Sequence, residues 1–153
     1  MRGAVLCAIV LIAACASEGS VEVQAQLARL DQEANDGLML IERALADPEF
    51  RELGDGVRMV EIAIRKLGVV ETDPHASDAQ RFQSMMLSAR AWDQLAGAFE
   101  HAADSTSVPT LRDKATPARF LATSGYARAI EFACGQGLTD HPLFVENAAV
   151  CPE

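Results

Sequence analysis

The stretch that decides the fold is residues 77–103, SDAQRFQSMMLSARAWDQLAGAFEHAA. Ser77 followed by Gln80 is a capping-box pattern, in which the side chain of each residue accepts a hydrogen bond from the backbone N–H of the other. Apolar residues then recur at intervals of three and four, which places them on one face of a helix. These residues are Phe82, Met85, Ala89, Trp92, Ala96, Phe99 and Ala103. The sequence therefore predicts an amphipathic helix from about Asp78 to Ala103, with Trp92 in the core.

The same spacing predicts two helices before this one. The first, from about Ser20 to Ala46, carries on one face Val23, Leu27, Leu30, Ala34, Leu38, Ile41 and Leu45. The second is expected to begin at Asp47-Pro48, an N-cap followed by proline at the first helical position, and to end near Leu67. Because Gly54-Asp55-Gly56 lies within this segment, the helix is either kinked there or begins only at Val57.

A fourth helix is predicted from Thr116 to Gly135. Thr116 is an N-cap residue before Pro117, and glycine is a common helix terminator. We expect residues 104–115 to form a loop with one short turn at 110–114, and residues 140–149 to add one or two helical turns. The expected inner face of the fourth helix consists of Leu121, Ala127, Ile130 and Cys134.

Four amphipathic helices joined by loops, without the alternating apolar pattern of strands, are typical of an all-α, antiparallel four-helix bundle. A solenoid of helix pairs is the main alternative. We find no repeat of about 34 to 45 residues with matching positions, which such a solenoid would require. We therefore expect one helical domain over residues 20–153, with a short C-terminal tail.

The first sixteen residues have the features of an export signal. Arg2 supplies a positive charge, and an apolar run follows from Gly3 to Ala14. This run is shorter than the roughly 20 residues that span a bilayer. It ends in Ile12-Ala13-Ala14-Cys15, which resembles the lipobox of bacterial lipoproteins, where the cysteine is lipidated and becomes the new N-terminus. The resemblance implies that Cys15 carries a lipid anchor.

Ordinary secretion is the alternative to the lipoprotein hypothesis. Ala14-Cys15-Ala16 also fits the pattern that the general signal peptidase cuts, which would leave Ser17 as the first residue. In the lipoprotein case, residues 1–14 are the signal peptide and residues 15–19 a lipidated linker. Stable anchoring then needs more than one acyl chain on the cysteine, because a single chain binds membranes only marginally. We expect a cell-envelope protein that faces the periplasm or the exterior, or otherwise a secreted or periplasmic one.

The charge of the chain argues against several classes of partner. It contains 22 Asp and Glu against 13 Lys and Arg, a net charge of −9. Nucleic acids and anionic membrane surfaces are both bound through clustered Lys and Arg. We therefore expect no nucleic-acid partner and expect membrane contact through the lipid anchor, with another envelope protein as a further candidate partner.

Cys134 and Cys151 are the only cysteines of the predicted helical domain, residues 20–153. In an oxidising compartment they are expected to form a disulfide, which stabilises the fold by about 3 kcal/mol in the chain-entropy model. A redox-active pair is the alternative, although catalytic dithiols usually occur as C-x-x-C at a helix start. We expect the disulfide to hold the apolar triplet Leu143-Phe144-Val145 against the helices.

No catalytic or ligand-binding motif stands out after the signal. The three histidines are His75, His101 and His141, and none has the glutamate three residues earlier that di-iron bundles supply. Methionine in a core is more typical of packing than of metal binding; the candidates are Met39, Met59, Met85 and Met86. The motifs G-x-x-x-x-G-K, G-x-G-x-x-G and G-x-S-x-G are absent. We predict no catalytic residue and no metal site. An enzyme is therefore ranked third, after the two functional hypotheses given below.

One family resemblance covers roughly residues 23–138. A third helix that carries Trp92, a loop, and a fourth helix that ends in Cys134-Gly135-Gln136-Gly137-Leu138 resemble cytochrome c-prime, an exported four-helix bundle. In that family the fourth helix ends in Cys-x-x-Cys-His, which attaches haem covalently and ligates its iron. Here Gly137 and Leu138 stand at the positions of the second cysteine and the histidine. The resemblance therefore implies the architecture and export, without covalent haem attachment.

Two functional hypotheses follow from these patterns. The first is an exported, membrane-anchored bacterial lipoprotein whose helical bundle is a binding or structural module of the cell envelope. The second is a cytochrome c-prime-like bundle that holds non-covalent haem or a metal for electron transfer or gas binding.

Overall fold

The computed structural model describes the backbone of residues 3–47, 49, 51–106 and 108–152, and the side chains of this set from residue 20 onward. The elements are α1 (Gly3–Leu45), α2 (Leu53–Glu71), α3 (Asp78–Thr106), α4 (Pro109–Gln136) and α5 (Pro142–Glu146). Within these described ranges every regular element is helical, which confirms the all-α prediction. No helix of the described part combines the length and hydropathy needed to cross a membrane. The predicted features of the Arg2 and Cys15 side chains lie outside the described residues.

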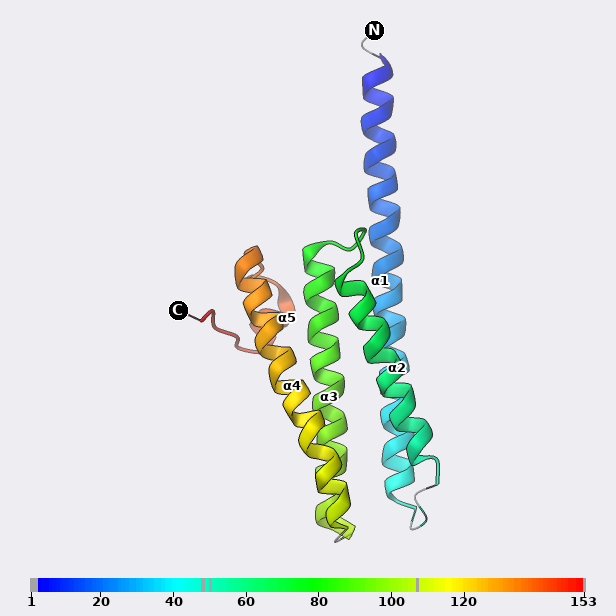
Figure 1. Cartoon of the computed structure of the whole chain (residues 1–153). Coiled ribbons are helices and arrows are strands. Elements are labelled where there is room, and N and C mark those ends of the chain that lie inside the picture. Colours follow the sequence, from blue (N-terminus) through cyan, green and yellow to red (C-terminus); the bar gives the residue numbers. More distant parts are fainter. Residues whose placement is uncertain (1–2, 48, 50, 107, 153) are drawn as a thin grey trace.

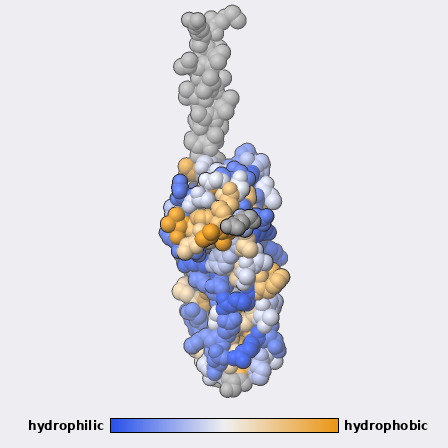
Figure 2. Space-filling model, turned by 90° about the vertical axis from the view of Figure 1, so that its left-hand side faces the viewer, coloured by the Kyte–Doolittle hydropathy of each residue, from blue (hydrophilic) through white to orange (hydrophobic). Residues whose placement is uncertain are grey.

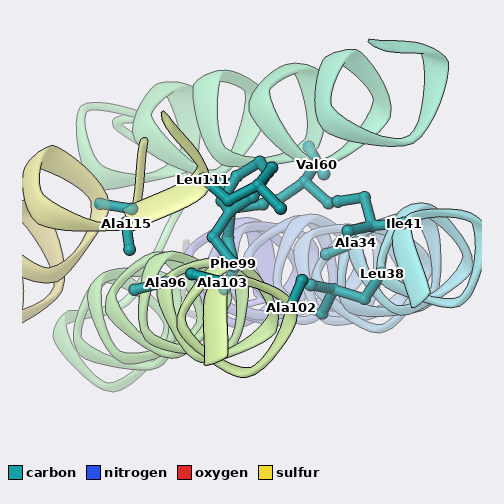
Figure 3. Close-up of a cluster of buried hydrophobic side chains, with 14 residues drawn as sticks. Ala34, Leu38, Ile41, Val60, Ala96, Phe99, Ala102, Ala103, Leu111 and Ala115 are labelled. Atoms are coloured by element: carbon teal, nitrogen blue, oxygen red, sulfur yellow. The ribbon is translucent and has the colours of Figure 1, made fainter. Parts of the chain in front are cut away.

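Helix α3 is the central element of the molecule. Extended contacts join α3 to α4, α2 and α1, and join α1 to α2. Figure 1 shows α4 and α5 on one side of α3 and the α1–α2 pair on the other. Side chains from all four long helices meet in one core, where Ile41 of α1, Val60 of α2, Phe99 of α3 and Leu111 of α4 lie close together (Figure 3).

Helices α1 and α2 approach each other through a pair of glycines. A methyl group on Gly56 would lie 2.8 Å from Cγ1 of Ile41 and 2.9 Å from the carbonyl oxygen of Gly37. A methyl group on Gly37 would lie 2.9 Å from Cγ2 of Val60 and 3.0 Å from the carbonyl oxygen of Gly56. The two backbones therefore pack at a distance that leaves no room for a side chain on either residue.

Helix α2 begins later than the Asp47-Pro48 pattern predicts, at Leu53. Asp47 instead closes a turn, because its carboxylate accepts hydrogen bonds from the backbone N–H of Glu49 at 3.0 Å and from Nε of Arg51 at 2.8 Å. The hydrogen bond from Glu49 is the largest cause of a lowered pKa of Asp47, and the one from Arg51 is the next. The alternative start at Val57 is also wrong, since the two glycines before it lie inside the helix.

The predicted capping box at the start of α3 is confirmed. Oε1 of Gln80 accepts from the Ser77 backbone N–H at 3.0 Å, and Oγ of Ser77 accepts from the Gln80 backbone N–H at 3.3 Å. The buried Gln80 side chain also donates from Nε2 to the carbonyl oxygen of Ser20 at 2.7 Å. One side chain thus starts α3 and ties it to α1.

Helix α3 buries more than the single predicted stripe, because it has neighbours on two sides. Its buried set adds Ser84, Met86, Ser88, Ala91, Leu95 and Ala102 to part of that stripe. Trp92, which was predicted to lie in the core, is instead only partly buried and packs against the edge of the core. The apolar spacing predicts which residues share one face of α3, whereas the positions of α2 and α4 decide which residues of α3 are buried.

The predicted start of the fourth helix is wrong. Helix α4 begins at Pro109, directly after Val108 as N-cap, and Pro117 lies inside it. Pro109 therefore occupies the first helical position. Thr116-Pro117 fits the pattern of a helix start but lies within α4. The expected loop over 104–115 is accordingly wrong as well, since α3 extends to Thr106. The proline inside α4 is exposed and removes one backbone hydrogen bond from the helix.

The predicted inner face of α4 is also wrong. Leu121 is 40% exposed, Ala127 is exposed, and the other two predicted residues are only partly buried. Instead α4 buries a set of small residues with one leucine, namely Leu111, Ala115, Ala118, Ala122, Ala129 and Ala133. A methyl group on Gly125 would lie 3.1 Å from Cβ of Ala89 on α3. The two helices pack closely because their facing residues are small.

Helix α4 ends at Gln136, one residue beyond the predicted end at Gly135, and Gly137 is the terminating glycine. Gly137 has a φ of 69°, which favours glycine. The backbone N–H of Leu138 donates to the carbonyl oxygen of Ala133 at 2.8 Å, and that of Gly137 donates to Cys134 at 3.3 Å. This pair of bonds is a Schellman motif. It stops the helix and turns the chain towards α5, which lies within the predicted segment 140–149.

The predicted disulfide between Cys134 and Cys151 is present, with 5.8 Å between the Cα atoms. It joins the last turn of α4 to the C-terminal tail. The tail is packed through Phe144, which is buried in a cluster with Phe82 of α3. The prediction for the triplet at 143–145 holds only in part, because Val145 is 64% exposed. Successive residues of the helix α5 point in different directions, so that Val145 faces the surface while Phe144 faces the core.

Candidate functional site

A groove runs along α3 between α2 and α4. It consists of two cavities that share Trp92 and Leu121 in their walls. The larger one, which we call the apolar lobe, has a volume of about 750 Å³. Its walls include the apolar residues Leu95 and Phe99, and also the charged residues Arg58, Glu61 and Lys114. The smaller one, the polar lobe, has a volume of about 390 Å³. We call the two together the α2–α4 groove.

The polar lobe is lined by a buried hydroxyl group that has no partner. Oγ of Ser88 makes no hydrogen bond with any described residue, although the side chain is only 9% exposed. One helical turn earlier, Oγ of Ser84 donates to the carbonyl oxygen of Leu67 at 2.7 Å. A buried polar group without a partner costs about 1–3 kcal/mol. Ser88 therefore places a hydrogen-bonding group without a partner among the described residues at the wall of the polar lobe.

An ion pair crosses the groove at the polar lobe. Nη2 of Arg128 on α4 lies 3.0 and 3.2 Å from the two carboxylate oxygens of Glu71 on α2. The Glu71 side chain is 14% exposed. Burial raises the pKa of Glu71, and the charge of Arg128 acts in the opposite direction. The two charges offset each other, which leaves the polar lobe without a net charge from this pair.

A second set of ion pairs holds α4 against α3 and thereby sets the position of one wall of the groove. Arg119 donates from Nε to Oε1 of Glu100 at 3.2 Å and from Nη2 to Oε2 at 2.5 Å, and it also pairs with Asp93. The hydrogen bonds to Glu100 are the first cause of the raised pKa of Arg119. Burial raises the pKa of Tyr126 on the same helix, and the negative charge of Asp93 raises it further.

The surface on the α4 side carries several apolar side chains. Figure 2 views this side and shows apolar areas within a largely hydrophilic surface. The large apolar residues that α4, α5 and the tail expose are Phe120, Leu121, Val145 and Val150. Of these, Leu121 lines the groove, whereas its neighbour Phe120 does not line either lobe. Leu121 therefore belongs to the groove, and Phe120 to the exposed surface outside both lobes.

A second groove of about 750 Å³ lies between α1 and α3. We call it the α1–α3 groove, and its walls include Met39, Glu42 and His101. The structure thus brings a thioether and an imidazole from two helices to one groove. His75 and His141 lie elsewhere, at the α2–α3 connection and against Phe82. No group of three or more possible metal-binding side chains occurs among the described residues.

Apolar spacing identified Met85, Ala89, Trp92 and Leu121, which line the polar lobe, only as inner-face residues of their helices, and no motif pointed to the polar groups of the lobe. Glu71, Ser88 and Arg128 belong to three different helices and are far apart in the chain. The one sequence signal was Ser84 and Ser88, small polar residues one turn apart in an amphipathic helix. Of the predicted site residues, Cys134 and Cys151 form their disulfide away from both grooves, and the side chain of Cys15 lies outside the described residues.

Comparisons with known proteins add no family to this description. The chain matches no family model, no curated protein and no solved structure. Its function is therefore inferred from the residues and geometry given above.

Proposed function

We propose that the protein is an exported bacterial lipoprotein, anchored at Cys15, whose four long helices form an antiparallel bundle that binds a ligand in the α2–α4 groove. The observation that carries the binding role is the unpartnered, buried hydroxyl of Ser88 at the wall of that groove. A hydroxyl in this position lowers the stability of the free protein, and a hydrogen-bonding ligand would remove that cost.

The proposal for the anchor rests on the sequence pattern before Ser17. A positive charge, a short apolar run and Ile12-Ala13-Ala14-Cys15 together match the lipoprotein signal. Among the side chains of α1 that the structure describes, from residue 20 onward, the first buried one is Val23. It follows Cys15 by about two helical turns, or roughly 12 Å of helix. An acylated Cys15 would therefore hold the bundle close to the membrane surface.

Mass spectrometry of the N-terminus tests the anchor. Protein isolated from its native envelope is expected to begin at an acylated Cys15, and Cys15→Ser is expected to abolish both acylation and retention in the membrane fraction. An unmodified N-terminus at Ser17 would show that the protein is secreted without an anchor. The binding role is tested separately, with the variants described in the next subsection.

The second candidate function is the binding of non-covalent haem or a metal, and one observation favours it. Met39 of α1 and His101 of α3 line the same α1–α3 groove, and thioether and imidazole groups are the usual protein ligands of electron-transfer haem. A haem-binding protein purified from its native envelope must show a Soret band, and His101→Ala should remove it. Purified protein without that band would exclude the haem form of this proposal.

A further inference from the structure

We infer that the α2–α4 groove binds an uncharged, single-chain amphiphile, with its alkyl chain in the apolar lobe and a hydroxyl, amide or ester headgroup on Ser88 in the polar lobe. The inference rests on the proposed binding role of the groove. It does not depend on the anchor at Cys15.

The apolar lobe can hold an alkyl chain along its apolar wall, with Arg58, Glu61 and Lys114 as the charged part of its lining. Between Val57 and Glu71 the groove follows α2 for roughly 21 Å, at 1.5 Å per helical residue. Its walls include Leu95 and Phe99 from the core, and the partly exposed side chains Trp92 and Leu121. A bound chain would remove the last two from water, which is the main source of affinity for an apolar ligand.

The polar lobe favours a headgroup without charge. Glu71 and Arg128 already neutralise each other at 3.0 Å, so that a charged headgroup would lose its hydration without gaining a counter-ion. The net charge of −9 on the chain further disfavours an anion. Ser88 can donate to and accept from a neutral headgroup. Gly68 provides space beside it, since a methyl group there would meet nothing within 4 Å.

An amphipathic helix of another protein is the alternative occupant of the groove. A helix has a diameter of about 10–12 Å with its side chains and satisfies its backbone groups internally. It would reach the buried hydroxyl of Ser88 only through a side chain. A thin chain that ends in a hydrogen-bonding group can lie along the groove and place that group beside Ser88.

The chain contains a single tryptophan, Trp92, which lies where the two lobes meet and reports on both. The mature protein, residues 15–153, is titrated with monolauroylglycerol, dodecanoate and dodecyltrimethylammonium below their micelle concentrations, and Trp92 emission is recorded. We expect saturable binding of the neutral compound, at least tenfold tighter than that of either charged one. Shortening its chain should weaken binding by about fourfold per methylene. Delivery as monomer and delivery from phosphatidylcholine vesicles distinguish a dissolved from a bilayer source.

Two matched glycines locate the binding site. Gly68 lines the α2–α4 groove and Gly97 lines the α1–α3 groove, and in both cases an added side chain meets nothing within 4 Å. Gly68→Phe should reduce affinity for monolauroylglycerol at least tenfold, while Gly97→Phe should leave it unchanged. Ser88→Ala should weaken binding of the neutral compound about fivefold or more and leave the charged compounds unaffected. Far-UV circular dichroism confirms that each variant is folded.

Three results would overturn the inference: no saturable change of Trp92 emission with any amphiphile, equal affinity for charged and neutral headgroups, or loss of binding in Gly97→Phe rather than Gly68→Phe. Binding of an amphipathic helical peptide that Gly68→Phe blocks would support the binding role of the groove and refute the amphiphile. An unacylated Cys15 would refute the anchor and leave the inference intact.

Discussion

The close contact of α1 and α2 gives a quantitative prediction for Gly56→Ala. The added methyl group would lie 2.8 Å from Cγ1 of Ile41, 2.9 Å from the carbonyl oxygen of Gly37 and 3.0 Å from the backbone nitrogen of Ile41. Two of these three atoms belong to the backbone of α1, which cannot rotate away as a flexible side chain does. The two helices must therefore move apart, and overpacking of this kind costs about 1–3 kcal/mol.

Gly54→Ala is the matched control, because Gly54 lies in the same helix and a methyl group there meets nothing within 4 Å. Alanine is favoured over glycine in a helix by about 0.8–1.0 kcal/mol, a gain common to both variants. The difference in free energy of unfolding between the two variants is therefore the steric cost alone, about 1–3 kcal/mol. Gly54→Ala should be more stable than the native protein, and Gly56→Ala less stable than Gly54→Ala.

Urea denaturation followed by far-UV circular dichroism measures both variants against the native protein. Equal midpoints for Gly54→Ala and Gly56→Ala would refute the reasoning, because the steric cost would then be absent. Gly37→Ala offers an independent check from the other helix, since its methyl group would meet the backbone oxygen of Gly56 at 3.0 Å.

Three further predictions concern the tail, α4 and the ion pair across the groove. Replacement of both Cys134 and Cys151 by serine should lower stability by about 3 kcal/mol and make the tail protease-sensitive, while most of the helical signal remains; limited proteolysis checks this. Pro117→Ala should stabilise the protein by up to about 3 kcal/mol, because it restores a hydrogen bond inside α4, and thermal unfolding measures the gain. Arg128→Ala should raise the pKa of Glu71 further, since the cation that opposes the effect of burial is removed, and an NMR titration of the carboxyl group measures the shift. A raised folded-state pKa favours the folded protein below the unfolded-state pKa, and this contribution is lost as the pH rises through the folded-state pKa. As the pH rises above about 4, near the unfolded-state pKa of glutamate, the urea midpoint of Arg128→Ala should therefore fall more than that of the native protein.

The sequence by itself determined the local structure of this protein. Apolar spacing predicted the existence of four long helices, and Ser77 with Gln80 predicted the start of α3, because a capping box is completed within one turn of the chain. The pairing of Cys134 with Cys151 followed from the number of cysteines in the predicted helical domain. Helix boundaries were less predictable, as at α4, where Thr116-Pro117 predicted a start that lies inside the helix, eight residues after the observed start at Pro109.

Only the tertiary structure decided which faces are buried and where the grooves lie. Alanines line the buried face of α4, and they carry too little hydrophobic signal for a periodic pattern to identify them, yet their small size is what lets α4 approach α3. Gly37 and Gly56 likewise have no side chain to mark a contact, and their role is visible only where two backbones meet. The polar lobe combines Glu71, Ser88 and Arg128 from three helices. Their proximity depends on how those helices pack, which no local pattern in the chain encodes.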